Sequence, residues 1–336
     1  MSRRRTALFA LLGVLGLAVA CVNPETREGA SGGAETGGDG PDRIAFFGFA
    51  KANSFATATF AGIEEYAKAN GAEAEFHDPN FDAQTQVRQI QDAITSGRFD
   101  VFIVQANDGT AVVPAVRSAV QQGITVVVEF TPVGTRYDTA EPQVPGTITL
   151  LDVPVDNGRK LGELGVEACR DRGAEPCRMA YLEGMKTLPL DNARTEAVLS
   201  TVRAAGVEVV ASVEGGYTKQ SGRAAMQDIL QANPRVDVVI GSSQAIAGAE
   251  AVAGDEDVLF VGNGGSRQAV RAVQEGRWFA TYYQPERTAG AKAAELGLRK
   301  AHGEQVPEST SYAEFAPGEG KGTADVLADV TGEYDE

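Results

Sequence analysis

Apolar runs of strand length alternate with amphipathic segments of helix length along almost the whole chain. Residues 43–48 carry the first continuous apolar run. The segment after it places Phe60, Ile63 and Ala67 on one helical face and stops at Gly71. Strands that read as uninterrupted apolar runs are buried on both faces, which is typical of parallel sheets covered by helices. The alternation therefore predicts an α/β fold.

The same alternation restarts after a predicted strand over residues 147–155. Strands are predicted over residues 43–48, 74–77, 101–105, 125–130, 147–155, 178–183, 208–213, 236–242, 258–262 and 278–284. Two doubly wound parallel sheets are implied, because each half repeats the order of strand and helix. Residues 317–336 are rich in Gly and acidic side chains, and we expect them to be loose.

The N-terminal residues have the composition of an export signal. Residues 1–6 include three arginines, residues 7–20 are apolar, and Cys21 follows. This apolar run is shorter than the roughly 20 residues that a membrane-spanning helix needs. Residues 1–20 are therefore predicted to be a signal peptide.

Residues 17–21 read Leu-Ala-Val-Ala-Cys and resemble a bacterial lipobox, with Ala18 where Leu is usual. This resemblance implies a lipid on Cys21 and an exported protein anchored to the outer face of the cell membrane. Residues 22–42, rich in Gly, Ser and Glu, would then form a flexible tether. The alternative is an ordinary secretory peptide with an incidental cysteine.

Charge and cysteine content restrict the partners. The formal net charge of −16 argues against nucleic acid, whose binding needs clustered Lys and Arg. Cys169 and Cys177 lie close in sequence, and export to an oxidising compartment predicts a disulfide between them. Zinc is disfavoured, because no Cys/His pair lies near them.

Candidate binding residues are those just past the predicted strands, since ligands of such folds bind at the carboxyl ends of parallel strands. They are mainly amides, hydroxyls and aromatics: Asn53, Phe55, Asp108, Glu129, Phe130, residues 185–190, Tyr217, Ser243, Gln244, Asn263 and Gln284. Apolar rings with convergent polar groups suit a sugar. Two alternatives stay open: Asp108 could cap the following helix, and Phe55 could be a core residue.

Enzymatic motifs are absent from the sequence. His77 and His302 lack sequence partners for general base chemistry. Residues 43–315 contain no Gly-x-Ser-x-Gly elbow. Residues 318–323 depart from a phosphate-binding loop, because Gly follows Lys321. We therefore expect a binding protein without a cofactor.

Several stretches resemble the type I periplasmic binding proteins of the ribose/galactose group, over about residues 43–315. Residues 53–55 (Asn-Ser-Phe) are similar to the family's Asn-Pro-Phe turn, and residues 92–112 to its second repeat. Residues 121–126 look like its Gly-Ile-Pro-Val strand entry. Residues 191–196 (Asp-Asn-Ala-Arg-Thr-Glu) match the helix that carries the ligand-binding arginine, which would be Arg194. Residues 261–284 match the last binding strand.

The resemblance implies two lobes, residues 43–152 with 285–312 and residues 153–284. Three crossovers near 152, 284 and 313 would form the hinge between them, and residues 313–336 would complete the last crossover and the tail. It also implies a monomer that passes a small polar solute, most simply a sugar, to the permease of an ABC-type importer. A sensory protein of the same fold is the alternative, whereas the export signal excludes a repressor.

Two departures from the family bear on the ligand. The sugar-binding members place an Asp-Arg pair after the strand at residues 126–128, where this chain has Glu129, Phe130 and Thr131. They also place an Asp where this chain has Gly264, with Asn263 one residue earlier. Losing charge-assisted hydrogen bonds of roughly 1.5–3 kcal/mol each changes ligand choice. The resemblance therefore does not carry a pentose ligand over to this chain.

Overall fold

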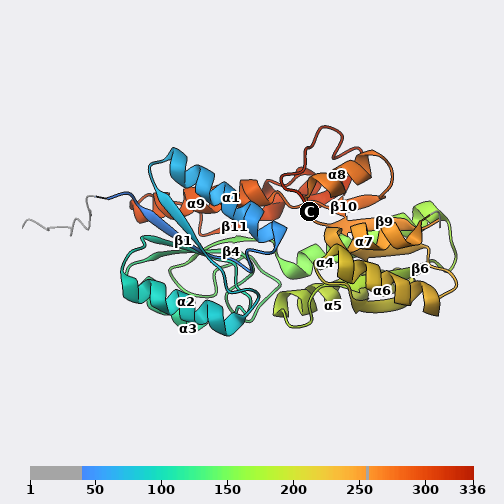
Figure 1. Ribbon diagram of the computed structural model, residues 1–336, viewed down its shortest axis with the longest axis horizontal. Helices are drawn as coiled ribbons and strands as arrows, with labels where there is room; N and C mark the ends of the chain where they lie inside the picture. The colour runs from blue at the N-terminus through green and yellow to red at the C-terminus, as the bar shows by residue number, and fades with distance from the viewer. Residues whose placement is uncertain (1–39, 255–256) are drawn as a thin grey trace, which may run out of the picture. The chain divides into compact units, whose positions relative to one another are not determined.

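Two six-stranded sheets organise this computed structural model, which describes residues 40–254 and 257–336 (Figure 1). The first contains β1 (Arg43–Phe47), β2 (Glu73–His77), β3 (Val101–Val104), β4 (Thr125–Phe130), β5 (Ile148–Leu151) and β11 (Ser309–Ser311), in the order β11-β5-β4-β3-β1-β2. The second contains β6 (Arg178–Glu183), β7 (Glu208–Glu214), β8 (Val238–Gly241), β9 (Leu259–Asn263), β10 (Ala280–Tyr282) and β12 (Lys321–Thr323), in the order β12-β10-β9-β8-β6-β7. Neighbouring strands are parallel except β10 and β12. The predicted α/β class with two parallel sheets is confirmed.

Helices cover both faces of each sheet. The first sheet packs against α1 (Ser54–Ala69), α2 (Ala83–Ser96), α3 (Val113–Gln121) and α9 (Glu286–Ala301). The second packs against α4 (Pro154–Arg172), α5 (Pro189–Ala204), α6 (Lys219–Ala232), α7 (Ser243–Ala253) and α8 (Arg267–Gln274). Two 3₁₀ turns follow β11: η1 (Tyr312–Glu314) and η2 (Pro317–Gly320). We call the first sheet with its helices the first lobe, and the second sheet with its helices the second lobe.

Strand β1 shows why the apolar runs are continuous. Ile44 and Phe46 belong to the core that includes residues of α1 and α9, whereas Ala45 and Phe47 belong to the core that includes residues of α2 and α3. Successive side chains of a strand point to opposite faces. Because helices cover both faces, every position of such a strand must be apolar.

The chain passes between the sheets three times. It leaves the first sheet after β5, returns from β10 to α9, and leaves again between β11 and β12. The predicted strand over residues 147–155 is shorter than expected, because Pro154 already occupies the first turn of α4.

The expectation of a loose segment over residues 317–336 is wrong. Residues 321–323 form β12, which pairs with β10 at the edge of the second sheet. Leu327 is fully buried in the second lobe's core, and Tyr334 is 6% exposed. Composition alone missed these few large side chains, which anchor an otherwise polar stretch.

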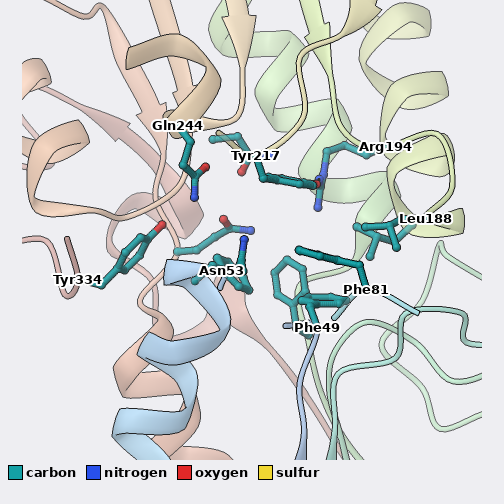
Figure 2. Close-up of a pocket in the computed structure, with 13 residues that line it drawn as sticks. Phe49, Asn53, Phe81, Leu188, Arg194, Tyr217, Gln244 and Tyr334 are labelled. Atoms are coloured by element: carbon teal, nitrogen blue, oxygen red, sulfur yellow. The ribbon is translucent and has the colours of Figure 1, made fainter. Parts of the chain in front are cut away.

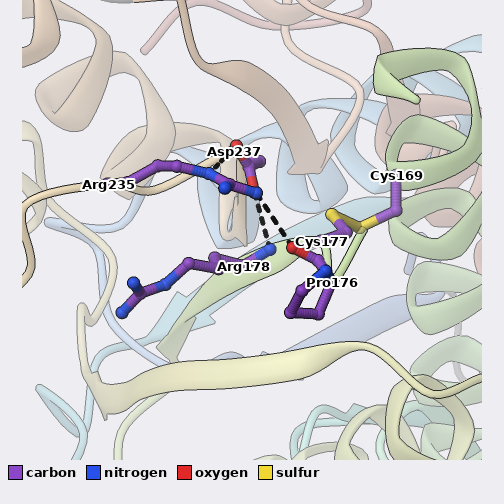
Figure 3. The surroundings of a disulfide bond; sticks show 6 residues. All are labelled: Cys169, Pro176, Cys177, Arg178, Arg235 and Asp237. Carbon is purple, nitrogen blue, oxygen red and sulfur yellow. Dashed lines mark hydrogen bonds and ion pairs between the residues drawn. A yellow bond between two sulfur atoms is a disulfide. The ribbon is translucent and has the colours of Figure 1, made fainter. Parts of the chain in front are cut away.

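A disulfide joins Cys169, near the end of α4, to Cys177, just before β6 (Figure 3). Polar contacts hold the same loop against β8. The Arg235 guanidinium donates to the carbonyl oxygen of Pro176 at 2.9 Å, and the Arg178 amide donates to Asp237 at 2.7 Å. The loop is therefore held by the disulfide to α4 and by these hydrogen bonds to the residues that precede β8.

Replacing both Cys169 and Cys177 with serine is expected to lower the free energy of unfolding. In the chain-entropy model, closing so short a loop stabilises the fold by about 2–3 kcal/mol. Denaturant unfolding of the oxidised wild type and of the double variant measures the loss. A difference below about 0.5 kcal/mol would mean that the contacts of Arg235 and Asp237 hold the loop without the disulfide.

None of the helices in the described residues combines the length and apolarity needed to cross a bilayer. The same part of the chain holds no cluster of His, Cys, Asp or Glu side chains placed to bind a metal ion.

Candidate ligand-binding site

A pocket lies where residues of both lobes meet, with about 460 Å³ of space free of atoms when the solvent at its mouth is included. Its lining comes from the first lobe (Phe49, Asn53, Phe55, Phe81, Phe130), the second lobe (Leu188, Leu190, Arg194, Tyr217, Gln244, Asn263), the segment between β10 and α9 (Gln284) and the last residues of the chain (Tyr334) (Figure 2).

Four phenylalanines form the first lobe's side of the pocket. Phe55, in the first turn of α1, packs edge-on against Phe130, with ring centroids 4.6 Å apart. Phe49 lies 6.0 Å from Phe130 and 6.3 Å from Phe81. Such a wall offers large apolar area with little conformational freedom. It is suited to the apolar face of a ring-shaped ligand.

Two of these phenylalanines sit on an unusual backbone. Phe81 has φ 61° and Phe130 has φ 59°, in the left-handed region that bulky residues rarely adopt. Each such residue costs of order 1–3 kcal/mol and persists only where its surroundings impose it. Both outliers place a ring in the pocket wall, which marks the wall as functional.

Arg194 provides a buried positive charge on the second lobe's side. It lies on α5 and is 5% exposed. Its Nη1 donates to Asp191 Oδ1 at 2.7 Å and to the Tyr217 hydroxyl oxygen at 3.2 Å. Its Nε is buried and has no hydrogen-bond partner among the described residues. The guanidinium is thus held on one side and has a donor left for a ligand.

Tyr217 completes this arrangement. Burial and the Asp191 carboxylate raise the pKa of Tyr217 well above its usual value, so its hydroxyl keeps the proton. That hydroxyl donates to Asp191 Oδ1 at 2.5 Å. Asp191 also accepts from the Met185 amide at 2.8 Å, and it balances the charge of Arg194. The site is therefore polar without a net charge from this group.

Three side-chain amides of the pocket each use one of their polar atoms in a contact within the protein, which fixes their orientation. Asn53 caps α1 through Oδ1, which accepts from the Ala56 amide at 2.9 Å and leaves Nδ2 for a ligand. Asn263 donates through Nδ2 to Asn157 at 3.2 Å, and its Oδ1 is buried without a partner in the described chain. Gln284 donates through Nε2 to Asp152, which leaves Oε1 free to accept. The pocket thus presents both a donor and acceptors.

Asp152 ties together the segments that cross between the lobes. It directly follows β5 and is 2% exposed. Its oxygens accept from the side-chain amide of Asn157 at 2.6 Å, from the Tyr282 hydroxyl at 2.7 Å and from the side-chain amide of Gln284 at 2.7 Å. Gln284 lies between β10 and α9, and Asp152 lies between β5 and α4. A ligand that contacts Gln284 would therefore touch a residue that is hydrogen-bonded to another crossing segment.

Seven of the ten predicted binding residues line the pocket: Asn53, Phe55, Phe130, Arg194, Tyr217, Asn263 and Gln284. Gln244, Leu188 and Leu190, which also follow predicted strands, line it as well.

Three predicted contacts do not reach the pocket lining. Asp108 accepts from the amides of Thr110 at 2.8 Å and Ala111 at 3.1 Å in the turn before α3, and it does not cap that helix, whose N-cap is Val112. Glu129 is fully buried beside Tyr312, whose hydroxyl donates to it, whereas the left-handed backbone of Phe130 (φ 59°) places the next side chain in the pocket wall. Ser243 is fully buried in the first turn of α7.

Phe49, Phe81 and Tyr334 were missed by the sequence analysis. Phe49 lies two residues past β1, closer to the strand than Asn53 and Phe55, and the same rule could have found it. Phe81 lies in the loop between β2 and α2, four residues past the strand. Tyr334 lies in the segment expected to be loose, and no local signal marks it.

A second buried polar cluster lies in the first lobe. Glu129 and Glu286 are both fully buried, and the Tyr312 hydroxyl donates to Glu129. Burial raises the pKa of Glu129 to about 7, and burial together with the Glu129 charge raises the pKa of Glu286 well above its usual value. Two carboxylates in one dry site favour a shared proton.

The fold and the pocket define a class: a two-lobed protein that holds one small molecule between parallel-sheet lobes. Residues 44–305 match the family model described as the periplasmic binding protein domain, and the chain belongs to this family. The predicted resemblance to the ribose/galactose group is confirmed. The chain is accordingly a binding protein and not an enzyme.

Individual relatives agree with this family assignment. The chain is 25% identical over 262 residues to the ribose import binding protein RbsB of Bacillus subtilis, and the match covers 77% of this chain and 81% of the relative. It is 27% identical over 227 residues to the D-ribose/D-allose-binding protein of Pseudomonas aeruginosa, over 66% and 67% of the two chains.

Solved structures share the fold. An ABC transporter solute binding protein from Bacillus halodurans with bound myo-inositol has a TM-score of 0.74 at 21% identity, over 89% of this chain and all of that one. A periplasmic solute binding protein from Actinobacillus succinogenes with bound D-allose has a TM-score of 0.72 at 20% identity, over 86% and 99%.

Proposed function

We propose that this protein binds one neutral monosaccharide or related polyol between its lobes and delivers it to an ABC-type importer. The observation that carries the proposal is the division of the pocket: a wall of four phenylalanines faces amides and one charge-paired arginine. Sugar rings have apolar faces and an edge of hydroxyls, which such a pocket matches on both sides.

The lining also limits the ligand. Among the described residues that form it, none carries a carboxylate, and Asp191, which contacts the lining residue Tyr217, is paired with Arg194. A cationic solute would therefore find no partner charge. Acceptors for ligand hydroxyls come from amide oxygens, such as those of Asn263 and Gln284. The ribose, allose and inositol bound by relatives are starting points for a search and not an assignment.

We further propose that the lobes move as two bodies, residues 43–152 with 285–312 and residues 153–284, about the three crossings. Closure would bring Phe55 and Tyr217 to opposite faces of the ligand. This is the hinge type of domain closure around a ligand.

A thermal-shift screen tests binding first. The compounds are added separately: D-ribose, D-allose, myo-inositol, other hexoses, polyols and nucleosides. A ligand present at 100 times its dissociation constant stabilises the folded protein by about 2.7 kcal/mol and therefore raises its melting temperature. Solution scattering with the best compound should then show a smaller radius of gyration. If no compound in the screen shifts the melting temperature, the sugar proposal fails.

Delivery and anchoring need separate experiments. Deleting the gene should abolish uptake of the bound sugar; normal uptake with loss of a sugar response would instead indicate a sensor. The proposed lipid attachment falls on Cys21, which lies outside the described residues. Cys21→Ser should release the protein from membranes, and a variant that still partitions wholly with membranes would refute the lipid.

A further inference from the structure

The last four residues, 333–336, contact both lobes beside the pocket. They lie beyond residues 44–305, which match the family model. They follow β12 and the buried Leu327, so the preceding chain is anchored in the second lobe.

On the second lobe the segment is fixed mainly by backbone contacts. Tyr334 forms a parallel bridge with Ser266, and its carbonyl oxygen accepts from the Arg267 amide at 2.8 Å. The Glu333 amide donates to the Gly265 carbonyl at 3.1 Å. An exposed ion pair between Arg267 and Asp335, at 2.7 Å, lies at the same place. The segment thus moves with the second lobe.

On the first lobe the segment makes a contact with α9. Glu333 accepts from the Thr288 amide at 2.9 Å and from the Thr288 hydroxyl. Thr288 is in the first turn of α9, where amides have no partner within the helix. A carboxylate at this position is also favoured by the helix dipole. The contact joins the two lobes through one side chain.

Between these contacts, Tyr334 projects into the pocket (Figure 2). Tyr334 is 6% exposed, and its hydroxyl is buried near the Ser243 hydroxyl and the Gly265 amide without a well-aligned hydrogen bond to a described residue. Buried polar groups are nearly always paired, and an unpaired one costs roughly 1–3 kcal/mol. A ligand hydroxyl would supply the missing partner.

We propose that residues 333–336 form a strap that retains the ligand: Tyr334 contacts the bound molecule, and Glu333 ties the closed lobes together. The inference rests on the proposed function for the ligand contact, whereas the tie between the lobes is independent of any ligand. Opening of the pocket requires that the Glu333–Thr288 contact breaks, because the rest of the segment is held on the second lobe.

The tie is tested on the full chain without any sugar. Hydrogen exchange of the Thr288 amide should be slow in the wild type and about tenfold faster in Glu333→Ala, which removes the only described acceptor of that amide. Asp335→Ala is the matched control, since it removes an exposed acidic side chain that contacts only the second lobe. Equal exchange in the wild type and Glu333→Ala would overturn the tie.

The ligand contact is tested by calorimetry with D-ribose, D-allose and myo-inositol, or with a stronger ligand from the screen. Tyr334→Phe should weaken binding by about 3- to 10-fold, the range for one hydrogen bond. Tyr137→Phe is the matched control, because the Tyr137 hydroxyl is also buried and unpaired in the described residues but does not line the pocket. Glu333→Ala should speed sugar release by about 3- to 10-fold.

The outcomes separate the two proposals. If no compound binds the wild type, the sugar function fails, while hydrogen exchange still decides whether the strap exists. If a sugar binds and Tyr334→Phe and Tyr137→Phe have equal affinities, the ligand contact is refuted. If Glu333→Ala releases sugar at the wild-type rate, the strap does not retain the ligand.

Discussion

Arg194→Ala should weaken sugar binding by some 30- to 150-fold. Arg194 is the one charged side chain in the described lining, and its Nε is buried without a partner. A charge-assisted, bidentate contact to ligand oxygens contributes about 2–3 kcal/mol, out of about 8 kcal/mol for a micromolar binder. Calorimetric titration with the sugar found by the screen measures the change.

The pairing of Arg194 with Asp191 needs its own control. Removing the guanidinium leaves a buried carboxylate whose remaining described partners are Tyr217 and the Met185 amide, so the variant also loses stability. Asp191→Asn keeps the guanidinium and tests how much of the affinity depends on its orientation. Glu196→Ala changes an exposed residue of the same helix and should leave affinity unchanged. An Arg194→Ala affinity within threefold of wild type would assign Arg194 a structural role only.

Much of the fold was accessible from the sequence because its sheets are buried on both faces. The strand over residues 178–183 was predicted with the bounds that β6 has in the structure. Helix α7 was not predicted. Its sequence, rich in Ala, has no polar face, since it is buried on most sides and its Gly248 lies against the backbone of Lys219 on α6. The periodicity signal fails where a helix has no exposed face.

The short strands were inaccessible for a different reason. Strand β11 pairs with β5 across about 160 residues of sequence, and β12 has three residues, one of them glycine. Neither has enough residues for a pattern. The positions of α9 and η2, which precede them, determine which strands they pair with. Those positions depend on tertiary contacts and not on local sequence.

The site shows the same limit at single positions. The rule that ligands bind past strand ends found Phe130 and Asn263, but it could not say which of two neighbours faces the pocket. Glu129 directly precedes Phe130 and is fully buried, yet only Phe130, whose φ of 59° departs from strand geometry, lines the pocket. Tyr334 is brought to the pocket by contacts with Ser266 and Arg267, distant in sequence, so no local pattern could have placed it.

Glu129→Gln should stabilise the protein above neutral pH by about 3 kcal/mol and change the pH dependence of its unfolding. Glu129 is fully buried below the pocket wall, and burial raises its pKa from 4.5 to about 7. A folded-state pKa above the unfolded one means that the folded protein binds more protons between these values. Stability therefore falls as pH rises from about 4.5 towards 8, and the lost amount is about 3 kcal/mol for this difference in pKa.

The surroundings of Glu129 agree with a neutral side chain. The groups that face it are Tyr312, Gln105, Asp152 and Glu286, and the last two are also acidic. Within the described residues, Glu129 Oε2, Gln105 Oε1 and Glu286 Oε1 are buried acceptors without a donor. A proton on one carboxylate supplies such a donor. The side-chain amide introduced by Glu129→Gln would supply one at every pH, while its oxygen would still accept from Tyr312.

Denaturant unfolding of wild type and Glu129→Gln across pH 4.5 to 8 provides the measurement. The two proteins should be equally stable near pH 4.5, and the variant should become the more stable one as pH rises. Glu64→Gln, an exposed change on α1, should follow the wild-type profile. Parallel profiles for wild type and Glu129→Gln would mean that Glu129 is ionised in the folded protein throughout this range. Its charge would then have to be stabilised by Tyr312 and Gln105 strongly enough to offset its burial beside Glu286.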